Sequence, residues 1–305
     1  MRHGVAVALL AAVLLTSGCS DDPPESAPAA ATSSATPAPA YDGTLEPAAA
    51  VLSLVPEDAR TLTVTDFDQV RAELGVDELD DRSAPADVAA FWQRAEAERP
   101  LLTTGMLRPA DDRLLSTYGF TGLDVAWEAH FFDGDGQEQG WVLRFRDATD
   151  MARVAAAADD PAGPVTDADV DAAAHLVSSG TVGDPEQSWA GDPELVALVG
   201  TPANATYVAR GCDPQPGADP EAGDLDELDG YSVQFEGSLA TARLGAGRHD
   251  LFTRMRLGES QPGFAAAYDG GVADPVSGRI GYVMTDPPAA ARLALAHELP
   301  FAACP

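Results

Sequence analysis

The stretch LDVAWEAHFFDGDGQEQGWVLRFR, residues 123–146, carries the clearest structural pattern in the sequence. Two runs of alternating apolar and polar residues flank the glycine-rich and acidic segment DGDGQEQG at 133–140. A period of two residues sends alternate side chains to opposite faces of a strand, so the pattern predicts a β-hairpin with one apolar face. That face is formed by Leu123, Val125, Trp127, Ala129 and Phe131 from the first strand, and by Trp141, Leu143 and Phe145 from the second.

The other face of this hairpin is charged. Asp124, Glu128 and His130 face Arg144 and Arg146. If the apolar faces are in register, Glu128 lies opposite Arg144 or Arg146, where opposite charges stabilise a strand pair. We therefore expect a solvated face with cross-strand ion pairs, and an ordinary surface role for His130.

Three other segments run from strand-like residues into an aspartate and then into a helical pattern. They place Asp66, Asp147 and Asp286 before the helices, where a carboxylate accepts hydrogen bonds from unpaired backbone N–H groups. We interpret these residues as helix caps rather than metal ligands. A further amphipathic helix is predicted over 85–99, a second hairpin over 230–245, strands near 174–182 and 204–212, and a short helix over 191–200.

These elements predict an α+β fold in which antiparallel sheet packs helices on one face. Residues 45–305 are enough for one large domain or two small ones. Each half contains an isolated strand, a hairpin and strand–helix units. The pattern favours a duplicated β-hairpin/strand–helix module with a boundary near 160–190.

The first 44 residues predict an exported, lipid-anchored protein. A basic start precedes an apolar run at 4–15 that is too short to span a bilayer and is typical of a signal peptide, here 1–18. LTSGC, ending at Cys19, resembles the bacterial lipobox, which implies that Cys19 is diacylated and becomes the new N-terminus. Residues 19–44 are rich in Pro, Ala, Ser and Thr and predict a disordered tether. The expected location is the outer face of the cytoplasmic membrane.

Composition excludes several classes of function. The 305-residue chain has 49 acidic and 18 basic residues, a net charge of −31, and every basic residue is Arg. This acidity argues against nucleic acid as a partner. The absence of Lys rules out a Walker A loop, a Schiff-base lysine and Ser-x-x-Lys acyl transfer.

Two cysteines remain beyond the lipobox, Cys212 and Cys304. An exported compartment permits a disulfide between them, which would tie the last segment to the middle of the domain. The alternative is a catalytic thiol, which needs a neighbouring base and an electropositive environment.

No metal or cofactor site is predicted. The turn at 133–140 fails the EF-hand pattern because position 6 is Glu138 and position 12 is Arg144. The acidic loop 213–230 is interpreted as a solvated surface loop, with loose calcium binding as the alternative. The histidines form none of the usual zinc spacings.

The blocks TVTDFDQVRAELG (63–75), YGFTGLDVAWEAHFF (118–132), WVLRFRD (141–147) and GRIGYVMTDPPAAARLALAHELPFAAC (278–304) resemble those of uncharacterised secreted actinobacterial lipoproteins. The resemblance implies location and fold, and it brings no catalytic or binding residue. We expect a non-enzymatic module that binds an envelope protein or a small ligand. The alternatives are an exported hydrolase with a site assembled from scattered Asp, Glu and His, and a spacer without a ligand.

Overall fold

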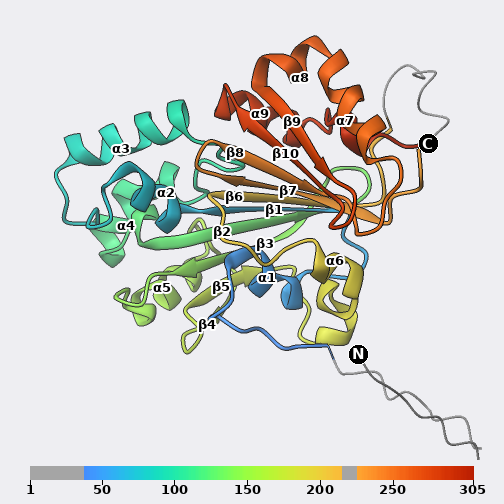
Figure 1. Cartoon of the computed structure of the whole chain (residues 1–305). Helices are drawn as coiled ribbons and strands as arrows, with labels where there is room; N and C mark the ends of the chain where they lie inside the picture. Colours follow the sequence, from blue (N-terminus) through green and yellow to red (C-terminus); the bar gives the residue numbers. More distant parts are fainter. Residues whose placement is uncertain (1–37, 215–224) are drawn as a thin grey trace, which may run out of the picture. The chain divides into compact units, whose positions relative to one another are not determined.

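A single antiparallel sheet organises the computed structural model, which describes residues 38–214 and 225–305 (Figure 1). Its strand order is β4-β5-β3-β2-β1-β6-β7-β8-β10-β9. The α+β class and the antiparallel sheet are therefore as predicted. The strands are β1 (Thr61–Asp66), β2 (Val125–Phe132), β3 (Glu138–Phe145), β4 (Asp169–Asp171), β5 (Leu176–Ser179), β6 (Ala205–Arg210), β7 (Gly230–Glu236), β8 (Leu239–Arg243), β9 (Tyr268–Asp274) and β10 (Arg279–Met284).

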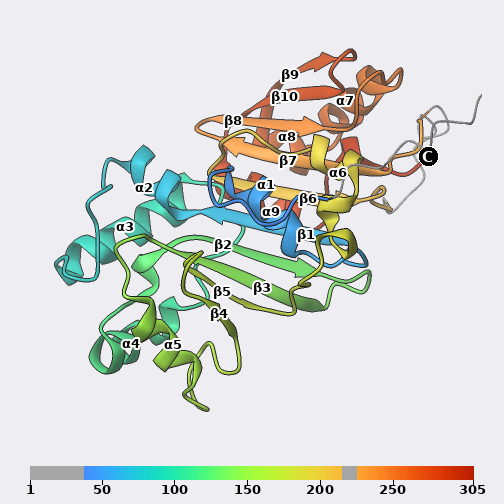
Figure 2. The ribbon, with the colours of Figure 1, turned by 90° about the horizontal axis from the view of Figure 1, so that it is seen from below.

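The strand order repeats within the sheet. Outward from the central β1–β6 pair, one side reads β1-β2-β3-β5-β4 and the other reads β6-β7-β8-β10-β9. Figure 2 shows these two sets on either side of the central pair. Residues 180–204 connect them. The expected duplication of a hairpin and strand–helix module is thus visible in the connectivity.

Helices cover the two faces of the sheet unequally. We call the side with the larger helices the helical face and the opposite side the reverse face. On the helical face, α2 to α5 pack on the first strand set, and α7 to α9 pack on the second. Residues of α1 and α6 pack on the middle of the reverse face, against Leu62 and Val208. The helices are α1 (Pro47–Val51), α2 (Phe67–Leu74), α3 (Pro85–Glu98), α4 (Asp111–Tyr118), α5 (Met151–Ala158), α6 (Pro193–Ala197), α7 (Leu251–Ser260), α8 (Pro262–Ala267) and α9 (Pro287–Leu295), with 3₁₀ turns at Leu52–Leu54, Arg108–Ala110, Gly122–Asp124, Pro185–Gln187, Trp189–Gly191 and Pro300–Ala302.

The hairpin at 123–146 forms, but its predicted register and its solvated face are wrong. Val125 pairs with Phe145, whereas Trp127 pairs with Arg144, so a bulge at Ala126 shifts the alignment by one residue. A one-residue slip exchanges the faces of the strand. Glu128 therefore lies opposite Leu143 and is only 1% exposed.

One of the three predicted caps is also wrong. Asp66 accepts a hydrogen bond from Gln69 N at the start of α2, and Asp286 accepts one from Ala289 N at the start of α9. Asp147 caps no helix, because α5 begins three residues later than its position implies. Asp150 is the cap there, and Asp147 instead accepts from Arg144 at 2.7 Å.

Candidate anion-binding site

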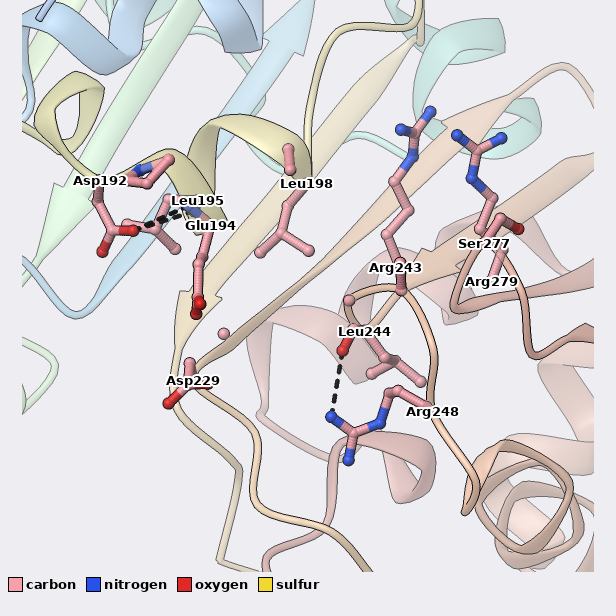
Figure 3. A pocket seen from close by; sticks show the side chains of 15 residues that line it. Asp192, Glu194, Leu195, Leu198, Asp229, Arg243, Leu244, Arg248, Ser277 and Arg279 are labelled. Carbon is pink, nitrogen blue, oxygen red and sulfur yellow. Dashed lines mark hydrogen bonds between the residues drawn. The ribbon is translucent and has the colours of Figure 1, made fainter. Parts of the chain in front are cut away.

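A cavity of about 420 Å³ lies at the edge of the reverse face. One wall is α6 with the start of β7, and the other is the end of β8 with the turn between β9 and β10 (Figure 3). Arg243, Arg248 and Arg279 all line it. We call it the arginine pocket. Three of the 18 cations of a strongly acidic chain therefore meet at one cavity.

Arg243 is the most unusual of these residues. It is the last residue of β8 and only 8% exposed. Its Nη2 donates to Thr201 Oγ1 at 3.0 Å, and its buried Nε has no hydrogen-bond partner among the described atoms. Burial lowers the pKa of Arg243, and the charge of Arg279 lowers it further. A buried, incompletely paired guanidinium costs free energy that an anion would offset.

Arg279 is directly opposite Arg243 in the β8–β10 pair and is exposed. Like charges in this position repel one another. Within the described residues, neither guanidinium has a carboxylate within 4.0 Å. Asp274 is the cross-strand neighbour of Arg279, but its carboxylate accepts from Ser277 Oγ and from Val276 N. The two arginines are thus placed together without an internal counter-ion at contact distance.

Three carboxylates, those of Asp192, Glu194 and Asp229, line the opposite wall of the pocket, and Glu46 is the other acidic residue near Arg243. Glu46, whose charge acts on Arg243, accepts from three backbone N–H groups, those of Ala48, Ala49 and Gly200. Asp192 belongs to the α6 wall, where it accepts from Glu194 N and pairs with Arg210 at 3.0 Å.

Arg248 also lines the pocket, but its guanidinium N–H groups already have hydrogen-bond partners. It contacts both carboxylate oxygens of Asp250, each at 2.9 Å, and donates to the carbonyls of Asp226, Glu227 and Leu244. Arg243 and Arg279 are therefore the cations that remain for a ligand. Planar guanidinium groups bind carboxylate and phosphate oxygens through paired hydrogen bonds.

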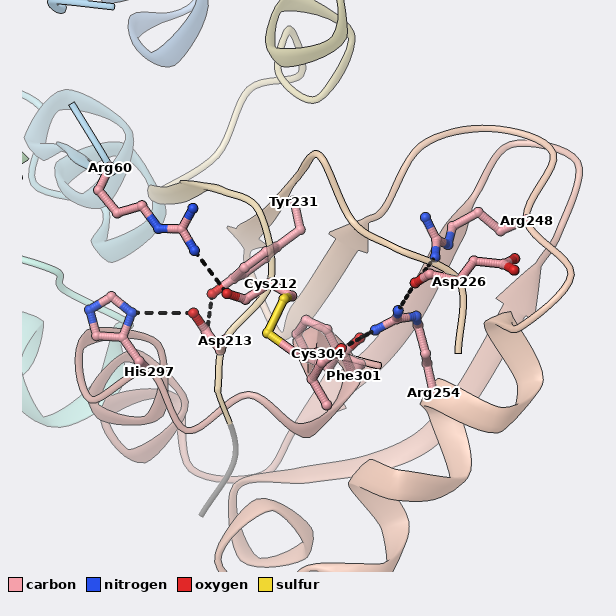
Figure 4. The surroundings of a disulfide bond; sticks show 11 residues. Arg60, Cys212, Asp213, Asp226, Tyr231, Arg248, Arg254, His297, Phe301 and Cys304 are labelled. Atoms are coloured by element: carbon pink, nitrogen blue, oxygen red, sulfur yellow. Dashed lines mark hydrogen bonds and ion pairs between the residues drawn. A yellow bond between two sulfur atoms is a disulfide. The ribbon is translucent and has the colours of Figure 1, made fainter. Parts of the chain in front are cut away.

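The predicted disulfide pair is brought together. Cys212 and Cys304 are 92 residues apart in sequence, with a Cα–Cα distance of 4.9 Å and sulfurs at bonding distance (Figure 4). Asp213 reinforces the connection, since its N–H donates to Ala302 O and its carbonyl accepts from Cys304 N. The predicted lipidation residue, Cys19, lies outside the described residues.

The Asp, Glu and His residues do not assemble the catalytic arrangement of a nucleophilic hydrolase around His130. The Nε2 of His130 lies 2.8 Å from Glu128, and its Nδ1 lies 3.2 Å from Glu138. Thr103 Oγ1 donates to Glu128 rather than to the imidazole. Nucleophilic catalysis needs the hydroxyl to contact the base. His130 is thus a partly buried ion-pair residue, and the surface role expected for it is wrong.

Metal ligands are likewise not gathered in the described parts of the chain. No group of three or more His, Cys, Asp or Glu side chains has a metal-binding arrangement there. Of the acidic loop 213–230, residues 215–224 lie outside the described residues. Asp213 at its start instead accepts a hydrogen bond from the Tyr231 hydroxyl.

Comparison of the chain with protein-family models, with curated proteins and with solved structures finds no significant match. None of the helices within 38–214 and 225–305 has the length and apolar character needed to cross a bilayer.

Sequence reasoning missed Arg243 and Arg279. Arg243 is the last residue of β8 and Arg279 is the first residue of β10. The apolar residues of these strands predict a buried strand and do not indicate a binding site. Arg243 does follow Leu239 and Thr241 at the strand period, which marks it as a reverse-face residue. Its partner could not be identified, because Arg279 is 36 residues away and becomes its neighbour only through the β8–β10 pairing.

Proposed function

We propose that this protein is an envelope binding module that holds the anionic group of a small ligand in the arginine pocket. The observation that carries the proposal is the buried, incompletely paired Arg243 with Arg279 directly opposite. A phosphate or carboxylate between them would relieve the repulsion and accept the free N–H groups.

The charge of the whole chain sharpens this preference. With a net charge of −31, most of the surface repels an anion. Within the pocket, the wall that carries Arg243 and Arg279 favours an anion, whereas the opposite wall carries the carboxylates of Asp192, Glu194 and Asp229. Binding should therefore be confined to this place and should weaken as salt screens the arginines.

The anchor is the second part of the proposal. Cys19 at the end of the lipobox would be acylated, and the residues between Cys19 and Ala38 would hold the domain away from the outer face of the cytoplasmic membrane. The last part of the expected tether, residues 38–44, belongs instead to the folded domain, since Ala38 N donates to Glu186 and Tyr41 packs against the core. Labelling of the chain with a fatty acid in its host, with Cys19→Ser as the comparison, tests this directly. Equal labelling of the two forms would contradict the anchor.

The binding proposal is tested by titrating the full chain with inorganic phosphate, sulfate and acetate at low salt, using calorimetry. Arg243→Gln and Arg279→Gln should each weaken binding about tenfold or more, because each removes charge-assisted hydrogen bonds worth about 1.5–3 kcal/mol. Arg256→Gln is the matched control, since Arg256 is exposed on α7 and does not line the pocket. The proposal fails if none of these anions binds, or if Arg256→Gln weakens binding as much as the pocket variants do.

A further inference from the structure

Beyond the arginine pocket, the reverse face of β8, β10 and β9 carries exposed apolar side chains. Leu239 is 51% exposed, Val283 is 44% exposed and Val272 is 71% exposed. Leu239 on β8 pairs directly with Val283 on β10, and Val272 on β9 pairs with Gly281 on β10. A Cβ placed on Gly281 would meet no atom within 4 Å, so the space above this glycine is open. We call Leu239, Gly281, Val283 and Val272 the apolar strip.

The apolar strip is continuous with the two arginines. Arg243, Thr241 and Leu239 alternate on one face of β8, as Arg279, Gly281 and Val283 do on β10. The intervening Ala240, Ala242, Ile280 and Tyr282 are buried on the helical face, whereas every residue of the alternating set except the buried Arg243 is exposed or half-buried. At about 3.3 Å per residue, the strip begins at Gly281, about 7 Å along β10 from Arg279. It extends to Leu239 and Val283, about 13 Å along their strands from the two arginines.

From this continuity we propose that the ligand is an anionic amphiphile, an alkyl or acyl chain that ends in a phosphate or carboxylate. Its head group lies between Arg243 and Arg279, and its chain lies along the apolar strip. This inference rests on the proposed function and adds the class of the ligand to it. Charge complementarity fixes the head-group end, and the apolar side chains fix the direction of the chain.

The dimensions of the strip favour a chain over a macromolecule. A stable protein interface buries about 800 Å² on each partner, with an apolar centre. The strip supplies only three large apolar side chains, and the exposed carboxylates of Asp269 and Asp274 border it on β9. A second copy of this chain would also bring a further net charge of −31, so the two copies would repel one another.

The test is a comparison of ethyl phosphate with octyl phosphate, the latter below its micelle-forming concentration, by calorimetry on the full chain. Octyl phosphate should bind at least about tenfold more tightly, because part of its longer chain leaves water. The double variant Leu239→Ser, Val283→Ser should remove this gain and leave ethyl phosphate binding unchanged. Leu115→Ser is the matched control, since Leu115 is 44% exposed on α4, a helix that packs on the first strand set.

The outcomes separate the two proposals. Equal affinity for ethyl and octyl phosphate overturns the amphiphile and leaves the anion site standing. If neither ethyl phosphate nor octyl phosphate binds to the unaltered chain, both proposals are overturned. A chain-length gain that survives in the double variant places the alkyl chain elsewhere and overturns the strip. A gain that Leu115→Ser also removes marks non-specific association and overturns it as well.

Discussion

Arg243 is a buried arginine whose only hydrogen-bond partner among the described residues is Thr201. Buried arginines in proteins are normally paired, because an isolated buried charge is costly. Arg254 of the same chain follows that rule: it is fully buried, binds Asp250 at 2.6 Å and donates to the carbonyls of Phe301 and Ala303. Arg243 has only Thr201. The contrast supports a counter-ion from outside the chain.

His130 should make the stability of the protein depend on pH. Burial lowers the pKa of His130, but the hydrogen bonds and charges of Glu128 and Glu138 outweigh this effect and raise it above its ordinary value of 6.5. A raised pKa in the folded state means that the stabilisation is complete below the unfolded-state pKa and is lost as pH rises through the folded-state pKa.

The free energy of unfolding lost by His130→Gln should therefore be larger at pH 5.5 than at pH 8.5, as measured by urea denaturation. His249→Gln, at an exposed position, serves as the comparison. A loss that is equal at both pH values would show that the ion pairs of His130 contribute no net stability.

At the scale of elements, close backbone contact between β3 and its neighbours requires glycine. A Cβ on Gly140 would lie 2.5 Å from the ring of Phe131 and would also clash with the carbonyl oxygen of Ser179 on β5. Gly140→Ala should therefore lower the free energy of unfolding by about 2–3 kcal/mol, because neither the ring nor the backbone can easily move aside.

The same hairpin offers the control for this prediction. A Cβ on Gly134 would meet no atom within 4 Å, so Gly134→Ala should change stability by less than about 0.5 kcal/mol. Thermal or urea denaturation of the two variants side by side provides the measurement. Similar losses in both would mean that the close contact at Gly140 relaxes without cost.

Elements also show where pattern reasoning works. The helix expected over 85–99 is α3, Pro85–Glu98. Its apolar residues at helical spacing share one side, where Phe91, Trp92 and Ala95 are buried and Val88 is half-buried. The second hairpin is confirmed as β7 and β8. Strand β9 was missed because YDGGVAD is rich in glycine, and it is a strand through its pairing with β10.

At the scale of the whole molecule, the repeated strand order makes the asymmetry of the reverse face informative. Near the end of β3, the counterpart of β8, Arg144 lies on the same face but pairs with Asp147. Helix α1 and the turn that follows it pack against the reverse face of the first strand set. The apolar strip of the second set has no such cover, as the exposure of Leu239 and Val272 shows. On the reverse face, one half of the repeat is thus covered and the apolar strip of the other half is exposed.

The disulfide should contribute strongly to global stability. It closes a loop with a sequence separation of 92 residues. On the chain-entropy model, Cys212→Ser with Cys304→Ser should lower the free energy of unfolding by about 4–5 kcal/mol. Thermal melts with and without a reductant give the measurement. The reductant should lower the melting temperature of the unaltered chain and leave that of the double variant unchanged. If neither the reductant nor the double substitution lowers the melting temperature, the bond is not formed in solution.

The sequence by itself determined the α+β class, the hairpins, the amphipathic helices, two helix caps and the pairing of Cys212 with Cys304. These features depend on local periodicity, on capping chemistry or on counting cysteines, all of which can be read along the chain. The register at Ala126, the burial of Glu128 and the meeting of Arg243 with Arg279 were decided only by tertiary structure. A bulge leaves the apolar–polar alternation on either side of it unchanged, so the sequence pattern does not reveal it. Two residues on separate strands become neighbours only when the sheet aligns them.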